Sequence, residues 1–240
     1  MKNLRHEMIK EMELRNFSDS TKLSYLKAMR DLLGFHNKKD PTEIDVQMIK
    51  DFLYHFRNNN IVRGRGKRSE NTVNKHRAGV IFFYDNILKR HDYQREIPSL
   101  KTKKKNPVIL SAEEVKQMID SVHKVQYKAI LMLLYSTGIR LAEIQKLKVT
   151  DIDSKRMVIN IRQGKGGKDR QAILTPTLLK VLRTYWRLNP NKHSSWLFTP
   201  TKNPATPGHF DKPMSATAYD YILKTAAKAA GVKKKFILTA

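Results

Sequence analysis

Apolar side chains recur at helical spacing throughout the N-terminal part of the chain. Residues 4–15 and 19–35 each have such a stripe, and a third begins behind Asp45, a residue type that often caps helices. A fourth stripe follows Ser69. The pattern predicts four short helices that form one small helical domain over residues 1–91.

Residues 92–107 interrupt this pattern with two prolines, four lysines and few apolar side chains, which predicts a linker between two domains. A second domain is expected over residues 108–240. It opens where Ser111 and Glu114 occupy the positions of a capping box, and a very apolar helix follows, ending at Gly138.

The hydrophobic period then changes from helical to alternating. The stretches "RMVINIRQ" and "RQAILT" alternate apolar and polar side chains, as half-buried strands do, and "GKGGKD" supplies a turn between them. Helical spacing returns behind Pro176 and again in a stretch that ends at Gly231. The sequence therefore predicts a mostly α fold with a small antiparallel sheet.

Charge narrows the range of partners. Lysine and arginine number 47 against 22 aspartate and glutamate residues, a formal charge of +25 on 240 residues, which favours a polyanion such as nucleic acid. The absence of cysteine excludes disulfides, thiolate catalysis and zinc fingers. The N-terminus has no apolar signal core, and no run approaches the roughly 20 apolar residues of a membrane span, so a cytoplasmic protein is expected.

Basic side chains gather in two places, a glycine-interrupted loop before the fourth helix and the linker. Lysines that only solubilise a protein would explain a scatter of charge better than these clusters. We therefore predict contacts to DNA phosphates from Arg63, Arg65, Lys67, Arg68, Lys101, Lys103, Lys104 and Lys105.

Arg140 follows a Ser-Thr-Gly break and has apolar neighbours on both sides, as if it were directed into the protein. A positioned guanidinium can hold a phosphate through two parallel hydrogen bonds, and Glu143, three positions on, could orient it across one helical turn. On this stretch alone, an internal Arg–Glu ion pair fits equally well.

Lys165 lies at the predicted tip of the hairpin. A lysine there usually belongs to a soluble turn, but a hairpin tip can also bring a general acid to a leaving oxygen in phosphoryl transfer. "GKGGK" is not a P-loop, because the required spacing is missing and a strand follows where a helix should.

Taken together, "STGIRLAEIQKLKVTDID" and "GKGGKDRQAIL" strongly resemble the tyrosine recombinase or phage integrase family, of the short Xer type. In that family Thr-Gly-Leu/Ile-Arg-x-x-Glu-Leu/Ile contains the first catalytic arginine, and Gly-Lys-Gly-x-Lys-x-Arg contains the catalytic lysine. The resemblance covers nearly the whole chain. It implies a SAM-like four-helix domain followed by an α+β catalytic domain.

The resemblance also implies site residues and a reaction. Arg140 would clamp a DNA phosphate, Glu143 would support it, and Lys165 would be the general acid. In the family a tyrosine attacks the scissile phosphate of double-stranded DNA, a 3′-phosphotyrosine forms, and a second strand reverses the step. No metal or other cofactor is implied, and homo- or hetero-oligomers with a recombinase on DNA are expected partners.

The sequence departs from the family after Lys165. A His-x-x-Arg pair, a Gly-His pair and a nucleophilic tyrosine should follow, yet the histidines beyond Lys165 are His193 and His209, and neither has arginine three positions on. Tyr219 and Tyr221 have spacing that favours core packing. The resemblance therefore predicts a truncated, catalytically inactive recombinase with an incomplete catalytic domain.

Two other functions stay open. One is a non-catalytic DNA-binding protein that competes with a full-length recombinase or regulates it. The other, a basic helical RNA-binding protein, fits the charge but leaves both motifs unexplained.

Overall fold

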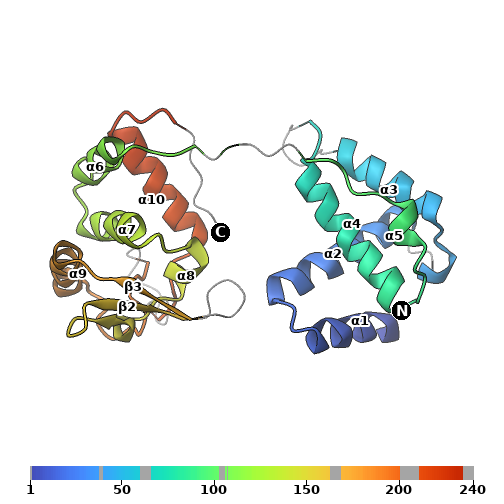
Figure 1. The fold of residues 1–240 in the computed structure, drawn as a ribbon, viewed down its shortest axis with the longest axis horizontal. Coiled ribbons are helices and arrows are strands. Elements are labelled where there is room, and N and C mark those ends of the chain that lie inside the picture. The colour runs from blue at the N-terminus through green and yellow to red at the C-terminus, as the bar shows by residue number, and fades with distance from the viewer. Residues whose placement is uncertain are drawn as a thin grey trace. The chain divides into compact units, whose positions relative to one another are not determined.

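The computed structural model describes residues 2–37, 40–59, 66–102, 106, 108–162, 169–200 and 211–234. The chain divides into two compact units, Met1–Lys105 and Asn106–Ala240, each with its own hydrophobic core (Figure 1). None of the helices in the described ranges has both the length and the apolar character needed to cross a membrane.

The first unit is built from helices. In chain order its elements are α1 (Lys2–Leu14), α2 (Asp19–Phe35), the 3₁₀ turn η1 (Pro41–Glu43), α3 (Val46–Asn58), α4 (Glu70–Asn86) and α5 (Tyr93–Glu96). The side chain of Asp45 accepts a hydrogen bond from a backbone N–H group in the first turn of α3, as predicted, and Ser69 caps α4 in the same way. Ser18 caps α2 in the same way.

Helices α2 and α4 pack closely against each other in this unit (Figure 1). Gly79 of α4 lies at the contact, where an added Cβ would stand 2.9 Å from Cα of Tyr25 and 3.0 Å from Cβ of Ala28. Any side chain here would force the helices apart, so glycine is required by the close approach of the two backbones.

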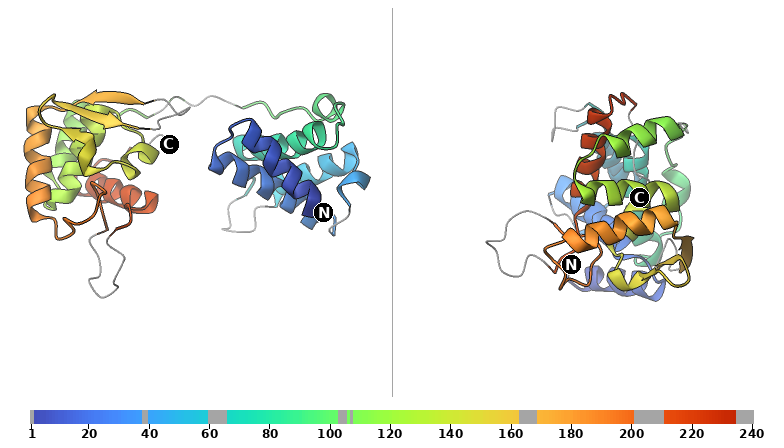
Figure 2. Two further views of the ribbon diagram at one scale, coloured as in Figure 1. Left: turned by 90° about the horizontal axis from the view of Figure 1, so that it is seen from below. Right: turned by 90° about the vertical axis from the view of Figure 1, so that its left-hand side faces the viewer.

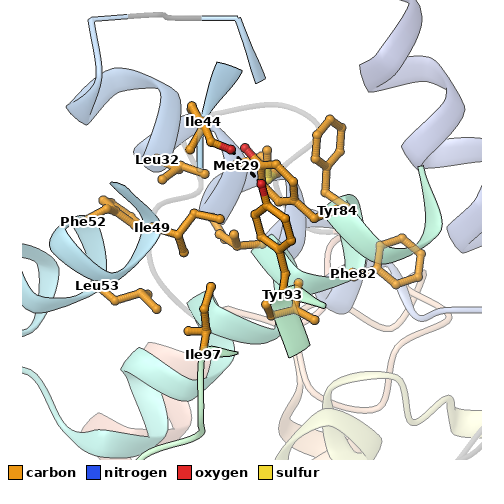
Figure 3. Close-up of a cluster of buried hydrophobic side chains, with 14 of the residues drawn as sticks. Met29, Leu32, Ile44, Ile49, Phe52, Leu53, Phe82, Tyr84, Tyr93 and Ile97 are labelled. Carbon is orange, nitrogen blue, oxygen red and sulfur yellow. Dashed lines mark hydrogen bonds between the residues drawn. The ribbon is translucent and has the colours of Figure 1, made fainter. Parts of the chain in front are cut away.

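Two tyrosines link the helices of the first core to the chain around η1 (Figure 3). The rings of Tyr84 and Tyr93 stack with their centroids 4.7 Å apart, and their hydroxyls donate to the carbonyls of Pro41 and Ile44, each at 3.0 Å. Tyr93 and Ile97 are both buried, so this core includes side chains beyond residue 91.

The second unit mixes helices with a small sheet. In chain order its elements are α6 (Ala112–Asp120), α7 (Val125–Thr137), α8 (Leu141–Gln145), η2 (Val149–Asp151), β1 (Ile152–Asp153), β2 (Val158–Ile161), β3 (Arg170–Ile173), α9 (Pro176–Leu188) and α10 (Ala216–Ala229). Ser111 and Glu114 form the predicted capping box of α6. Helix α7 lies in the middle, between the sheet and the pair formed by α6 and α10 (Figures 1 and 2).

The sheet is antiparallel, in the order β1-β2-β3. Ile159 of β2 pairs with Ile152 and with Ala172, and Ile161 pairs with Arg170. The two predicted strands are confirmed as β2 and β3, whereas the two-residue β1 is too short for alternation to indicate it. Residues 164–168 of the predicted turn, and Gln163 before it, lie outside the described residues. A mostly α fold with a small antiparallel sheet is thus confirmed.

Tyr219 and Tyr221 have different environments on α10. Tyr219 is fully buried, as predicted, but Tyr221 is 63% exposed, so the prediction of core packing is wrong for Tyr221. The reason is geometric: two positions correspond to more than half a turn of an α-helix, so the two side chains lie on opposite faces.

Candidate active site

Arg140 follows a glycine turn at the end of α7. The helix ends at Thr137, and Gly138 adopts a left-handed φ of 57°, which glycine tolerates without steric strain. Ile139 is buried next, and Arg140 is extended, with φ −76° and ψ 156°, immediately before α8. The Ser-Thr-Gly break therefore fixes where the arginine leaves the helix.

The carboxylate of Glu143 contacts both the backbone and the side chain of Arg140. Its Oε2 accepts a hydrogen bond from the backbone N–H of Arg140 at 3.0 Å, and its Oε1 accepts one from Nη1 of the same residue at 2.9 Å. The first bond caps α8, and the second is the contact across one helical turn that the spacing predicts.

A second arginine, Arg170, reaches the same carboxylate. Its Nη2 donates to Oε2 of Glu143 at 2.8 Å, across 27 positions of the chain. Sequence reasoning missed this contact. The available signal was the arginine that ends "GKGGKDR", but the motif does not indicate which acidic residue that arginine meets.

The three side chains differ in exposure. That of Glu143 is 3% exposed, whereas those of Arg140 and Arg170 are 38% and 36% exposed. The site therefore combines one buried negative charge with two positive charges that reach the surface, an excess of one positive charge. Because a guanidinium has five N–H donors, some donors of Arg140 remain for an arriving anion.

The arginines also set the ionisation of Glu143. Burial by itself would raise the pKa of this carboxyl group, but hydrogen bonds from the backbone and side chain of Arg140 and from Arg170 outweigh burial and lower the pKa below its usual value. Glu143 is therefore ionised at neutral pH, and all three contacts are charge-assisted or made to a charged acceptor.

Helix α10 and the segment just before it hold α8 from another side. The hydroxyl of Tyr219 donates to the carbonyl of Ile144 at 3.5 Å, and Nε2 of Gln145 donates to the carbonyl of Met214 at 3.2 Å. Burial raises the pKa of the Tyr219 phenol well above its usual value. Tyr219 is thus a neutral core residue that supports the helix behind Arg140.

Most of the other predicted site residues cannot be placed. Lys67 and Lys101 are exposed, as a contact to DNA requires. The remaining predictions outside the described residues are Lys165, Arg63, Arg65, Lys103, Lys104 and Lys105.

Arg68 is described, and its guanidinium is engaged within the first unit. Its Nη1 donates to the carbonyls of Phe56 and Asn59, the latter at 3.0 Å, and its Cζ lies 4.1 Å from the centroid of the Phe56 ring. These contacts satisfy carbonyl groups at the C-terminal end of α3, which lack partners within the helix.

Comparison with known proteins identifies the class to which this fold and site belong. The family model "Phage integrase, N-terminal SAM-like domain" matches residues 4–92, and the model "Phage integrase family" matches residues 109–237. The chain belongs to the phage integrase family, that of the tyrosine recombinases.

Individual relatives agree with this membership. The chain is 38% identical over 199 residues to the putative integrase/recombinase y4qK of Sinorhizobium fredii, covering 82% of this chain and 62% of that protein. It is 33% identical over 129 residues to tyrosine recombinase XerA of Pyrococcus furiosus, covering 53% and 43% of the two chains.

A solved structure has a similar fold. The match to lambda integrase, in the crystal structure of its tetramer bound to a Holliday junction, has a TM-score of 0.67 at 14% identity and covers 98% of this chain and 65% of that one. The chain thus spans less than two thirds of the length of each of these relatives.

Proposed function

We propose that this chain binds duplex DNA as part of a site-specific tyrosine recombinase and that Arg140 holds the phosphate at which strands are exchanged. The observation that supports this most directly is the pair of half-exposed guanidiniums on the buried carboxylate of Glu143. A guanidinium fixed in this way offers donors to a phosphate and needs little reorganisation as negative charge grows there.

The other roles follow the family motifs. Glu143 orients Arg140, and Lys165 protonates the leaving 5′-oxygen as the tyrosine–phosphate bond forms. Exposed Lys67 and Lys101, with Arg63, Arg65 and Lys103 to Lys105, contact DNA phosphates from the first unit, while residues 108–240 supply the catalytic part. The recombinase names of the relatives, and the Holliday junction bound by lambda integrase, support DNA as the partner.

We further infer that these 240 residues do not cleave DNA by themselves. Neither His193 nor His209 has an arginine three positions on, and the hydroxyl of Tyr219 is buried against the carbonyl of Ile144. Cleavage then needs a nucleophile and a second arginine from outside these residues. The same observation favours the alternative of a non-catalytic protein that occupies recombination sites.

DNA binding is tested by fluorescence anisotropy with a labelled duplex. If about six phosphates are neutralised, the logarithm of the affinity should fall against the logarithm of salt concentration with a slope near −5. A slope near zero would remove the proposed DNA-binding function.

Cleavage is tested with a nicked suicide substrate, followed by a denaturing gel. We expect no protein–DNA adduct, because losing the nucleophile removes the covalent route and losing one charge-stabilising donor alone costs about 100- to 1000-fold in rate. Because Tyr221 is exposed, the test also decides whether this tyrosine can act as the nucleophile. An adduct mapped to Tyr221, and lost in Tyr221→Phe, would mean that the chain is an active recombinase.

A further inference from the structure

We propose that Arg170 is a positioning residue, which fixes the guanidinium of Arg140 through the carboxylate that the two arginines share. The proposal rests on the proposed function, because it assumes that Arg140 binds phosphate. It adds a role for a residue of β3 that acts on the phosphate only through Glu143 and Arg140.

The hydrogen bonds to Glu143 restrain its carboxylate from two directions. Oε1 and Oε2 accept from Nη1 and the backbone N–H of Arg140, and Oε2 also accepts from Nη2 of Arg170. Arg140 immediately precedes α8, the short helix that contains Glu143, so its contacts can rotate with that helix. The contact from Arg170 comes from the sheet, so it ties the carboxylate to a separate element.

The backbone of Arg170 is itself held in place. It pairs with Ile161 in the β2–β3 ladder, one end of a register that continues to Ile173 opposite Val158. Because Arg170 is anchored there, its side chain transmits the position of the sheet to Glu143. The guanidinium of Arg140 is half-exposed, and the contact between Arg170 and Glu143 therefore helps to fix its orientation.

The hydrogen bonding of Arg170 favours a positioning role over a phosphate contact of its own. Its Nη2 is occupied by Glu143, and its Nε is buried without a hydrogen-bond partner in the part of the chain that the structure describes. Leaving a buried donor unpaired is costly, so the side chain is oriented for Glu143 at the expense of its Nε. Among the described residues, the side chain of Arg140 donates to Glu143 through Nη1.

Backbone amide exchange of Arg140, followed by NMR in the DNA-free protein, tests the coupling without relying on function. Arg170→Gln should speed exchange about tenfold, the factor for losing one charge-assisted hydrogen bond, and Arg170→Lys should restore part of the protection. Arg162→Gln is the matched control, because Arg162 forms an ion pair with the buried Asp151 at 3.0 Å. It should leave the amide of Arg140 unchanged. Unchanged exchange in Arg170→Gln would overturn the proposal.

The second test is a double-mutant cycle on DNA binding. Arg140→Gln and Arg170→Gln should each make the salt slope less steep by about 0.9, the value for one phosphate, and the double variant should reduce its steepness no further. A reduction near 1.8 in the double variant would make Arg170 a phosphate contact of its own. An unchanged slope in Arg170→Gln, beside a reduced slope in Arg140→Gln, would make the role of Arg170 purely structural. Either result contradicts the proposal.

The two tests separate the inference from the proposed function. If the unmodified protein does not bind DNA, the proposed function fails, while amide exchange at Arg140 still decides whether Arg170 positions it. If Arg170→Gln does not fold, Arg170→Lys keeps the charge but removes the planar fork, and the same two measurements are made on it.

Discussion

Arg68 in the first unit and Arg140 in the second are both arginines that the sequence indicates as DNA contacts, yet their surroundings differ. Arg68 donates to two backbone carbonyls at the end of α3 and lies over the ring of Phe56. Arg140 donates to a carboxylate, and that carboxylate also binds Arg170. One guanidinium caps a helix, and the other belongs to a cluster with excess positive charge.

The difference shows that the acceptor indicates what an arginine does. Carbonyls at a helix C-terminus and an aromatic face attract a guanidinium through partial charges, and they hold the chain in place. A single carboxylate between two arginines neutralises half of their charge and leaves the rest for an anion. The difference predicts a mainly structural role for Arg68 and supports the phosphate-binding role that we propose for Arg140.

The largest effect is expected from Arg68→Ala. This change removes hydrogen bonds to the end of α3 and the contact with Phe56, so the free energy of unfolding of the first unit should fall by about 2 kcal/mol. Chemical denaturation followed by far-UV circular dichroism measures the loss. Lys67→Ala is the matched control: this neighbour is exposed, and its loss should change stability by less than about 0.5 kcal/mol. Equal effects would remove the structural role of Arg68.

Much of the fold could be predicted because its signals are local. Ser111 and Glu114 are three residues apart, and the alternation in β2 and β3 is visible within a few residues. The contact of Arg68 with the carbonyls of Phe56 and Asn59 has no comparable signal, since it depends on how the chain returns toward α3. Because Arg68 lies in a basic, glycine-rich run, the sequence predicts a contact to DNA for it.

Arg140→Lys should destabilise the protein less than Arg68→Ala does, but it should weaken DNA binding. Glu143 keeps its bond from Arg170, and the side chain of Arg140 is 38% exposed, so the second unit should lose less than about 1 kcal/mol. DNA affinity should nevertheless fall about tenfold, because an ammonium cannot form two parallel bonds to a phosphate.

Trp186 and Trp196 both lie in the second unit, so tryptophan fluorescence follows its unfolding selectively. Removing one partner of a buried structural ion pair costs about 3–5 kcal/mol. A loss of that size in Arg140→Lys, with unchanged DNA affinity, would make Arg140 a structural residue like Arg68.

Only the part of the candidate site that is local in the sequence could be predicted. Arg140 and Glu143 are three positions apart and share a helical turn, but Arg170 joins them only when the sheet packs near α8. Long-range contacts of this kind depend on tertiary packing, which the hydrophobic pattern does not specify. Tyr221 illustrates the same limit within a helix, where apolar spacing alone did not separate the buried from the exposed face.

The smallest expected effect is on the pH dependence of stability. Because the pKa of Glu143 is lower in the folded protein than in the unfolded chain, the unfolded state binds a proton first as the solution is acidified. The stabilisation from this group is therefore complete above its unfolded pKa and is lost as pH falls through its folded pKa. In Arg140→Lys the folded pKa should move back toward its usual value.

The stability difference between wild type and Arg140→Lys should accordingly be largest near neutral pH and shrink in acid. Denaturation of the second unit in steps from about pH 7 to about pH 3, followed by tryptophan fluorescence, measures that difference. Arg68→Ala is the reference, followed by circular dichroism: its guanidinium bonds carbonyls and a ring, so its deficit should stay constant over the same range. If the Arg140→Lys deficit were equally independent of pH, Arg140 would not govern the ionisation of Glu143, and the contrast between the two arginines would fail.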